Sequence, residues 1–113
     1  MITQRDLLLV PFPFSDQSGK KVRPVVVVSN DWFNDSSEDV IVVGVTSNLS
    51  KSRYSVNLSS NDLEEGKLMD LCCIKVESIL KVEKSLVIKK IGKLSNKKFN
   101  EVHNILQEII RTN

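Results

Sequence analysis

An arginine, a threonine and a serine occur where their side chains could bind a phosphate group. Arg23 opens an apolar run that extends to Ser29, and Thr46 and Ser47 close a second run that begins at Asp39. If these runs are consecutive antiparallel strands, the start of the first lies beside the end of the second. A guanidinium and two hydroxyl groups at one rim of a sheet can hold a phosphate. The same spacing also fits an arginine that only satisfies strand-end carbonyl groups and a Thr-Ser pair that only ends a strand.

The two runs have the composition of strands in the middle of a sheet or barrel. Both are rich in valine, and β-branched residues pack well on a pleated surface. Neither run alternates with polar residues, which predicts burial on both faces. Pro24 is tolerated at the first residue of a strand, and it favours an extended conformation at Arg23. Residues 30–38, between the runs, are rich in turn formers and are expected to form a loop.

A first strand is expected over residues 6–14, before the two central runs. Pro11 and Pro13 cannot donate to a strand ladder, so this strand should end at an edge or rim of the sheet. The polar turn at residues 15–21 leads into Arg23, and it either faces a substrate or is only a hairpin tip. Further extended segments are expected over residues 54–58, 68–76, 79–82 and 89–94, with a turn-rich loop over residues 59–66 and one helical turn over residues 85–88.

One C-terminal helix is predicted to pack on the sheet. Ser95 is a good helix N-cap. Apolar residues follow at helical spacing and form one stripe: Phe99, Val102, Ile105, Leu106 and Ile109. His103 is the only histidine, and it falls off this stripe among polar residues, so it is expected on the surface. These patterns together predict a compact, mostly antiparallel β domain closed by one helix.

Composition places the chain among small globular proteins. Its 113 residues are expected to form one domain, residues 1–113, with no targeting or membrane segment and a cytoplasmic location. The net charge of +2 is too small to indicate nucleic-acid binding by itself. Residues 84–98 hold six lysines and no acid, a run that could meet phosphates or form a solvated face. Cys72 and Cys73 are adjacent, so on a strand they point to opposite faces, and they are interpreted as reduced core thiols.

The sequence lacks the groups that many hydrolases use. It has no Gly-rich phosphate loop, no Cys/His metal spacing and no Ser/His/Asp arrangement, because the single histidine is poorly placed. The carboxylates are scattered, so neither a metal nor another cofactor is expected. An enzyme of this kind suits a substrate that supplies its own nucleophile. RNA does so, because its 2′-hydroxyl can attack the neighbouring phosphate while the enzyme orients it and stabilises charge.

Four blocks of the sequence resemble, in order and spacing, the PemK/MazF family of toxins from type II toxin–antitoxin systems. The blocks are residues 6–16, 21–29, 43–47 and 90–95, and they include Pro-Phe-Pro-Phe, Arg-Pro and Thr-Ser motifs. The resemblance spans nearly the whole chain and implies an SH3-like antiparallel β-barrel with a C-terminal α-helix, assembled as a homodimer. It implies a metal-independent endoribonuclease that cuts single-stranded mRNA at short sequences and leaves a 2′,3′-cyclic phosphate and a 5′-hydroxyl. It also implies a small acidic cognate antitoxin that covers the RNA groove.

The catalytic arginine and threonine of that family fall on Arg23 and Thr46. In that picture Arg23 mainly stabilises charge at the scissile phosphate, because arginine rarely gives up a proton. Thr46, supported by Ser47, hydrogen-bonds a phosphoryl oxygen. Trp32 could stack an unpaired base, or lie in a dimer interface or pack within its loop. The other candidate RNA contacts are Asp16, Gln17, Lys20, Lys21 and Asn48.

One residue departs from the family pattern, and two other functions stay open. The family usually has glycine before the opening acidic residue, where this chain has Arg5, which concerns the N-terminal turn more than the phosphate rim. Some members of the family bind without cutting, so a non-catalytic RNA- or protein-binding barrel is an alternative. A gyrase poison of the CcdB type is another. Such poisons depend on a C-terminal Trp-Gly-Ile ending, whereas this chain ends Ile-Arg-Thr-Asn.

Overall fold

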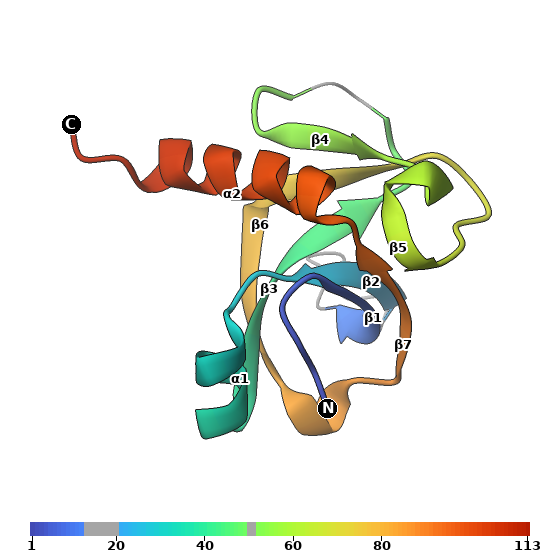
Figure 1. The fold of residues 1–113 in the computed structure, drawn as a ribbon, viewed down its shortest axis with the longest axis vertical. Coiled ribbons are helices and arrows are strands. Elements are labelled where there is room, and N and C mark those ends of the chain that lie inside the picture. The colour runs from blue at the N-terminus through green and yellow to red at the C-terminus, as the bar shows by residue number, and fades with distance from the viewer. Residues whose placement is uncertain (13–20, 50–51) are drawn as a thin grey trace.

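A curled antiparallel sheet forms most of the molecule. The structure is a computed structural model that describes residues 1–12, 21–49 and 52–113. Its strands are β1 (Asp6–Phe12), β2 (Lys21–Val27), β3 (Asp39–Thr46), β4 (Ser55–Leu58), β5 (Leu63–Gly66), β6 (Cys72–Glu83) and β7 (Lys89–Leu94). They lie in the order β4-β6-β3-β2-β1-β7-β5, and Figure 1 shows the sheet curling into a half-barrel with a helix across it. The predicted mainly β fold with a C-terminal helix is confirmed.

Two hydrophobic clusters cover the two faces of the central strands. Val25, Val26 and Val27 are all fully buried. Val26 belongs to one cluster, whereas Val25 and Val27 belong to the other, because successive side chains on a strand point to opposite faces. β3 divides its valines between the clusters in the same way. The predicted burial of both runs on both faces is therefore confirmed.

The first strand ends at a rim of the sheet, as its prolines predict. β1 pairs with β2 from Leu7 to Phe12, whose partner is Lys21. On its other side it pairs with β7 only over residues 6–9, so Pro11 lies beyond the end of that ladder. Pro13 falls outside the described residues. The missing N–H of Pro11 thus costs no hydrogen bond to β7.

The C-terminal helix α2 (Asn96–Ile110) packs its predicted stripe on the sheet. The side-chain hydroxyl of Ser95 accepts a hydrogen bond from the backbone N–H of Lys98 at 3.1 Å, which caps the first turn. Phe99 and Val102 are buried, and the remaining apolar residues of the stripe pack against the cluster that holds Val26. His103 is exposed, as expected. None of the helices in the described parts of the chain is both long and apolar enough to cross a membrane.

A short helix, α1 (Asp31–Ser36), occupies the segment that is expected to form a loop. The side chain of Asn30 accepts a hydrogen bond from the backbone N–H of Phe33 at 2.8 Å, and Asp31 places a carboxylate in the first turn. Asn, Asp and Ser favour turns, but they also favour helix N-termini, because their side chains bond nearby backbone groups in both settings. The loop prediction is wrong for this reason.

Strand β6 is a single long strand in place of the two expected over residues 68–76 and 79–82. Its ladder with β3 contains a bulge: Val43 pairs with Ile79, and the next residue, Gly44, pairs with Lys75. Residues 76–78 therefore have no partner on β3. Because of the bulge, the apolar pattern of β6 is interrupted, and the sequence predicts two strands where the structure has one.

The segment expected to be a loop, residues 59–66, contains the 3-10 turn η1 (Ser60–Asp62) and strand β5, which pairs with β7. A second 3-10 turn, η2 (Lys84–Leu86), overlaps the expected helical turn.

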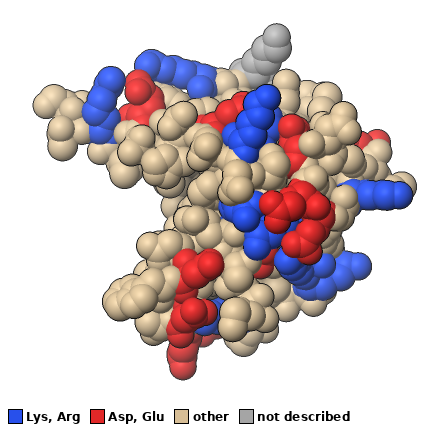
Figure 2. Space-filling view, in the orientation of Figure 1, with Lys and Arg blue, Asp and Glu red and all other residues tan. Residues whose placement is uncertain are grey.

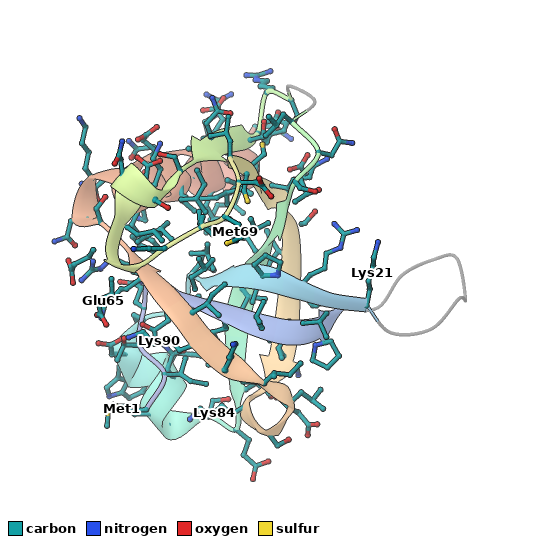
Figure 3. All side chains as sticks on the ribbon, turned by 90° about the vertical axis from the view of Figure 1, so that its right-hand side faces the viewer. Met1, Lys21, Glu65, Met69, Lys84 and Lys90 are labelled. Atoms are coloured by element: carbon teal, nitrogen blue, oxygen red, sulfur yellow. The ribbon has the colours of Figure 1, made fainter. Side chains whose placement is uncertain are left out.

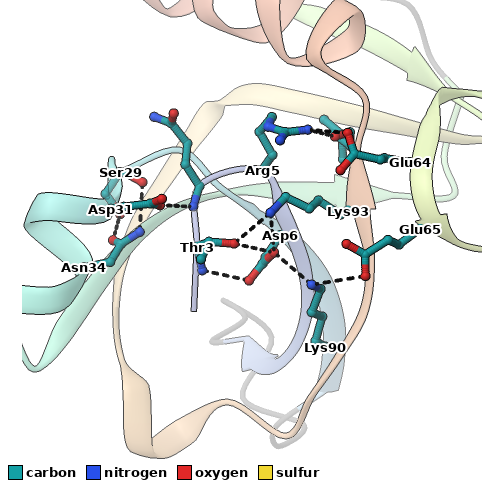
Figure 4. A network of polar contacts seen from close by, with 12 residues as sticks. Thr3, Arg5, Asp6, Ser29, Asp31, Asn34, Glu64, Glu65, Lys90 and Lys93 are labelled. Atoms are coloured by element: carbon teal, nitrogen blue, oxygen red, sulfur yellow. Dashed lines mark hydrogen bonds and ion pairs between the residues drawn. The ribbon is translucent and has the colours of Figure 1, made fainter. Parts of the chain in front are cut away.

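Arg5, at the position where the PemK/MazF family usually has glycine, adopts a backbone conformation that favours glycine. Its φ angle is 80°, in the left-handed region where side chains are strained. Its guanidinium donates to the carbonyl oxygen of Leu94 at 2.7 Å and lies 3.2 Å from the carboxylate of Glu64. Figure 4 shows these contacts beside the buried carboxylate of Asp6. Contacts that only a long basic side chain can make thus offset part of the backbone strain.

Three of the six lysines in residues 84–98, namely Lys90, Lys93 and Lys98, form ion pairs with acids. Lys90 lies 3.3 Å and Lys93 lies 4.0 Å from the buried carboxylate of Asp6, and Lys90 also contacts Glu65 (Figure 4). Lys98 pairs with two further carboxylates. Figure 2 accordingly shows basic and acidic side chains interleaved on this face instead of one basic surface. The solvated, paired alternative fits this run better than a phosphate-binding patch.

Candidate functional site

The candidate site lies where strands β2 and β3 separate. Their ladder ends at the pair Val25 and Gly44. Beyond that pair Pro24 has no N–H to donate to β3, and Arg23 pairs only with Val10 of β1. The guanidinium of Arg23 lies 3.5 Å from the hydroxyl oxygen of Thr46, at the outer limit of a hydrogen bond. β2 begins at Lys21, two residues before the expected start at Arg23, because pairing with β1 extends the strand.

The hydroxyl of Thr46 is oriented by its neighbours. Its oxygen accepts a hydrogen bond from the backbone N–H of Asn48 at 3.1 Å and faces the guanidinium of Arg23. Donors therefore occupy the acceptor side of this oxygen, which has two lone pairs. Within the described part of the chain, its O–H proton has no acceptor among the hydrogen bonds found. This arrangement leaves the proton available for donation to an anionic oxygen such as that of a phosphate.

Two adjoining clefts share Arg23 and Thr46. The larger, of about 360 Å³, has the size of an ordinary ligand pocket, and it is lined by Lys21, Val22, Arg23, Pro24, Val45, Thr46, Ser47, Asn48 and Cys72. The smaller, of about 60 Å³, is lined by Arg23, Gly44, Val45, Thr46, Lys75 and Ser78. Among residues 1–12, 21–49 and 52–113, neither lining contains a carboxylate, although the chain has 14 acidic residues. Such a set of cations, hydroxyl groups and an amide suits a polyanionic ligand.

The structure gathers most of the described candidate residues and separates one. Lys21, Ser47 and Asn48 line the larger cleft with Arg23 and Thr46. Figure 3 shows Lys21 at the tip of β2, on the opposite side of the view from Lys90. The side chain of Trp32 is 81% exposed on α1, which joins the far ends of β2 and β3, so it does not line this cleft. Three further candidates, Asp16, Gln17 and Lys20, lie outside the described residues.

Lys75 is a cleft residue that the sequence analysis does not identify. It is half-buried in β6, and it lines the smaller cleft with Arg23 and Thr46. The available signal is one charged residue inside the otherwise apolar run Cys72–Val76. That signal does not show which strand faces Lys75, because the register of β6 depends on its bulge opposite Gly44.

The adjacent cysteines are both free thiols, in different surroundings. Cys73 is buried, whereas Cys72 is half-buried at the edge of the larger cleft. Burial, the nearby carboxylate of Asp70 and then Cys73 raise the pKa of Cys72, which keeps it protonated. Its thiol donates to the backbone carbonyl of Asp70 at 3.4 Å. No group of three or more His, Cys, Asp or Glu side chains among the described residues is placed to hold a metal ion.

Comparisons with known proteins agree with this fold. Residues 3–110 match the model of the family described as PemK-like, MazF-like toxin of type II toxin–antitoxin system. A curated relative, the endoribonuclease MazF of Staphylococcus saprophyticus, is 33% identical over 98 residues, covering 87% of this chain and 79% of that protein.

Solved structures share the fold at low sequence identity. A MazE–MazF crystal structure from Deinococcus radiodurans has a TM-score of 0.79 at 16% identity and covers 99% of this chain and 98% of its own. The Mycobacterium tuberculosis toxin MazF-mt6 has a TM-score of 0.77 at 13% identity, covering 96% and 99%. A mycobacterial endoribonuclease in complex with its cognate antitoxin has a TM-score of 0.71 at 15% identity, covering 96% and 93%. On the family match and the 33% identical relative together, this chain belongs to the PemK-like, MazF-like toxins of type II toxin–antitoxin systems.

Proposed function

We propose that this protein is the toxin of a type II toxin–antitoxin pair and acts as a sequence-specific endoribonuclease on single-stranded mRNA. The observation that carries the proposal is the contact between Arg23 and Thr46 in clefts that no described carboxylate lines. The name of the 33% identical relative, an endoribonuclease, supports the same activity. The reaction needs no metal, because the 2′-hydroxyl of the RNA attacks the adjacent phosphate and leaves a 2′,3′-cyclic phosphate and a 5′-hydroxyl.

The proposed catalytic roles follow from the two side chains that meet at the rim. The guanidinium of Arg23 holds the scissile phosphate and stabilises the negative charge that develops on its oxygens. The O–H of Thr46 donates to a phosphoryl oxygen, and Ser47 adds a second hydroxyl beside it. Lys21 and Asn48 contact the flanking nucleotides in the larger cleft. Asp16, Gln17 and Lys20 belong to the same proposed RNA surface.

The proposal extends to partners and location. The protein works as a homodimer of one-domain chains spanning residues 1–113, and a cognate acidic antitoxin covers the RNA cleft. Solved relatives in this fold include a complex with a cognate antitoxin, which supports that kind of partner. The exposed Trp32 is assigned to a protein–protein surface instead of the RNA cleft, because it lies at the far ends of β2 and β3. The cytoplasm is the expected location, because the substrate is mRNA.

The end groups of the products test this function. A long mixed-sequence RNA is incubated with the purified protein in EDTA, and the cut sites and termini are mapped. The proposal expects cuts at one short sequence, with 5′-hydroxyl and 2′,3′-cyclic phosphate ends. An oligonucleotide with 2′-deoxyribose at the mapped site should bind but stay intact, because it lacks the nucleophile. Cleavage of that oligonucleotide would contradict the mechanism, and no cleavage of any RNA would favour a binding module.

A further inference from the structure

We propose that Lys75 is a second cationic catalytic residue. It contacts the scissile phosphate from β6, whereas Arg23 contacts it from β2 on the other side of β3. This inference rests on the proposed ribonuclease function and adds a residue to the same site. Arg23 and Lys75 come from strands on either side of β3, and the two side chains line one small cleft with Thr46.

The sheet register places Lys75 on the face that carries Arg23 and Thr46. Ile74 and Val76 both belong to the hydrophobic cluster under α2, so Lys75, between them, points to the opposite face. The same alternation puts Arg23 on that face, because Val25, two residues along, belongs to the second cluster. Lys75 pairs with Gly44 of β3. Because glycine has no side chain, none from this position of β3 lies between Lys75 and Arg23.

The bulge in β6 lies directly at the cleft. The ladder with β3 skips residues 76–78 immediately after Lys75, and Ser78 re-enters the lining of the smaller cleft. Bulges break strand pairing and re-aim side chains, and they are frequent beside functional sites. Here the bulge brings a basic and a hydroxyl side chain from one strand to the rim formed by β2 and β3. The smaller cleft then has two cations and two hydroxyl groups, the donors that a phosphate accepts.

Electrostatics favours an anion between the two basic side chains. Arg23 and Lys75 are both half-buried, and none of the described residues that line their common cleft is an acid. An anion in this cleft would be attracted by both positive charges, which repel each other. By contrast, the half-buried Lys93 and Lys98 each lie within 4.0 Å of a carboxylate. For Lys75, none of the ion pairs formed by the described residues supplies such a partner.

The two cations would act differently on the phosphate. The guanidinium of Arg23 is a planar fork that orients the group through its donors, whereas the ammonium of Lys75 is a compact point charge. A charge held on the second side of the phosphate stabilises the extra negative charge of the transition state. Because the contact is stronger in the transition state than with bound RNA, loss of Lys75 should lower the cleavage rate more than the affinity.

The first experiment probes the site without cleavage. Inorganic phosphate is titrated into wild-type protein, Lys75→Met and Lys81→Met, and backbone amide signals are followed by NMR. Lys81 is the matched control, because it lies on the same strand with an exposed side chain 3.8 Å from Asp39. We expect wild-type shifts centred on Gly44, Thr46 and Lys75, weakened several-fold in Lys75→Met and unchanged in Lys81→Met. No shifts at these amides in the wild type, or equal binding by Lys75→Met, would overturn the inference.

The second experiment measures cleavage by the same three proteins. Single-turnover cleavage by Lys75→Met should be about 10- to 100-fold slower, the cost of losing one charged contact. For a 2′-deoxy oligonucleotide, the logarithm of the binding constant falls linearly with the logarithm of the salt concentration. In Lys75→Met this slope should be shallower by about 0.7, the value for one phosphate contact on a single strand. Full activity in a folded Lys75→Met protein would contradict the inference. If the wild type does not cut RNA, the proposed function fails, and the phosphate titration still decides whether Lys75 binds a phosphate.

Discussion

At the scale of single residues, the site depends on how one hydroxyl group is oriented. The hydroxyl oxygen of Thr46 accepts from the backbone N–H of Asn48 and faces the guanidinium of Arg23, so its proton is left for another acceptor. The contact with Asn48 is a local turn bond, of the kind that Ser and Thr form with the N–H two residues ahead. The short sequence motif Thr-Ser-Asn thus fixes the acceptor side of the Thr46 hydroxyl and leaves its proton available to a ligand.

Replacement of Thr46 by valine should separate shape from hydrogen bonding. Thr46→Val keeps the β-branched shape but removes the donor, so single-turnover RNA cleavage should fall about 10- to 100-fold. Thr46→Ser keeps the hydroxyl and should stay within a few-fold of the wild type. Equal rates for the valine and serine variants would show that the hydroxyl does not take part.

Cys72 should respond to pH in a way that reports its surroundings. Burial and then the carboxylate of Asp70 raise its pKa, so less thiolate is present at pH 8 than in an ordinary cysteine. The midpoint of alkylation against pH should lie above the ordinary thiol value in the wild type and move down in Asp70→Asn. Mass spectrometry distinguishes Cys72 from the buried Cys73, which should react only on unfolding. An unchanged midpoint in Asp70→Asn would contradict this account.

At the scale of elements, the N-terminal turn carries strain that contacts partly offset. Arg5 has a φ angle of 80°, and its backbone bonds both Val27 and Leu94. Left-handed backbone costs an ordinary residue about 1–2 kcal/mol. The guanidinium contacts with Leu94 and Glu64 act in the opposite direction. The turn tolerates arginine because these two effects compete.

A pair of substitutions at Arg5 should measure the backbone strain alone. Arg5→Ala and Arg5→Gly lose the same guanidinium contacts, but only glycine relieves the positive φ angle. In urea unfolding, we expect Arg5→Gly to be more stable than Arg5→Ala by about 1 kcal/mol, the strain less the entropy lost by glycine. Higher stability of the alanine variant would mean that the turn has no such strain.

The elements also show what local sequence can and cannot predict. Continuous valine runs and the stripe that follows Ser95 identify β2, β3 and α2, because burial and helical spacing are local signals. α1 is missed, because Asn30 and Asp31 serve turns and helix starts equally well. The place of Lys75 in the cleft is missed for another reason: it depends on a bulge and on pairing between strands about 30 residues apart in the chain.

At the scale of the whole molecule, folding places the ion-paired lysines and the basic residues of the clefts at different rims of the sheet. On and beside β7, Lys90, Lys93 and Lys98 pair with acids, whereas the clefts at the other rim have no described acid in their linings. A net charge of +2 conceals this separation. Only after folding do Arg23, Lys75 and Thr46 line one small cleft, the cleft to which we assign phosphate binding.

The most direct test of the central claim is RNA cleavage in EDTA by wild-type protein and by Arg23→Ala. Both proteins should give the same circular dichroism spectrum and cooperative unfolding, because Arg23 lies outside both hydrophobic clusters. We expect discrete cuts by the wild type and a loss of about 100- to 1000-fold in rate in Arg23→Ala, the usual cost of removing a preorganised charge-stabilising donor. Wild-type rates in the folded variant would contradict the assignment of this rim as the active site.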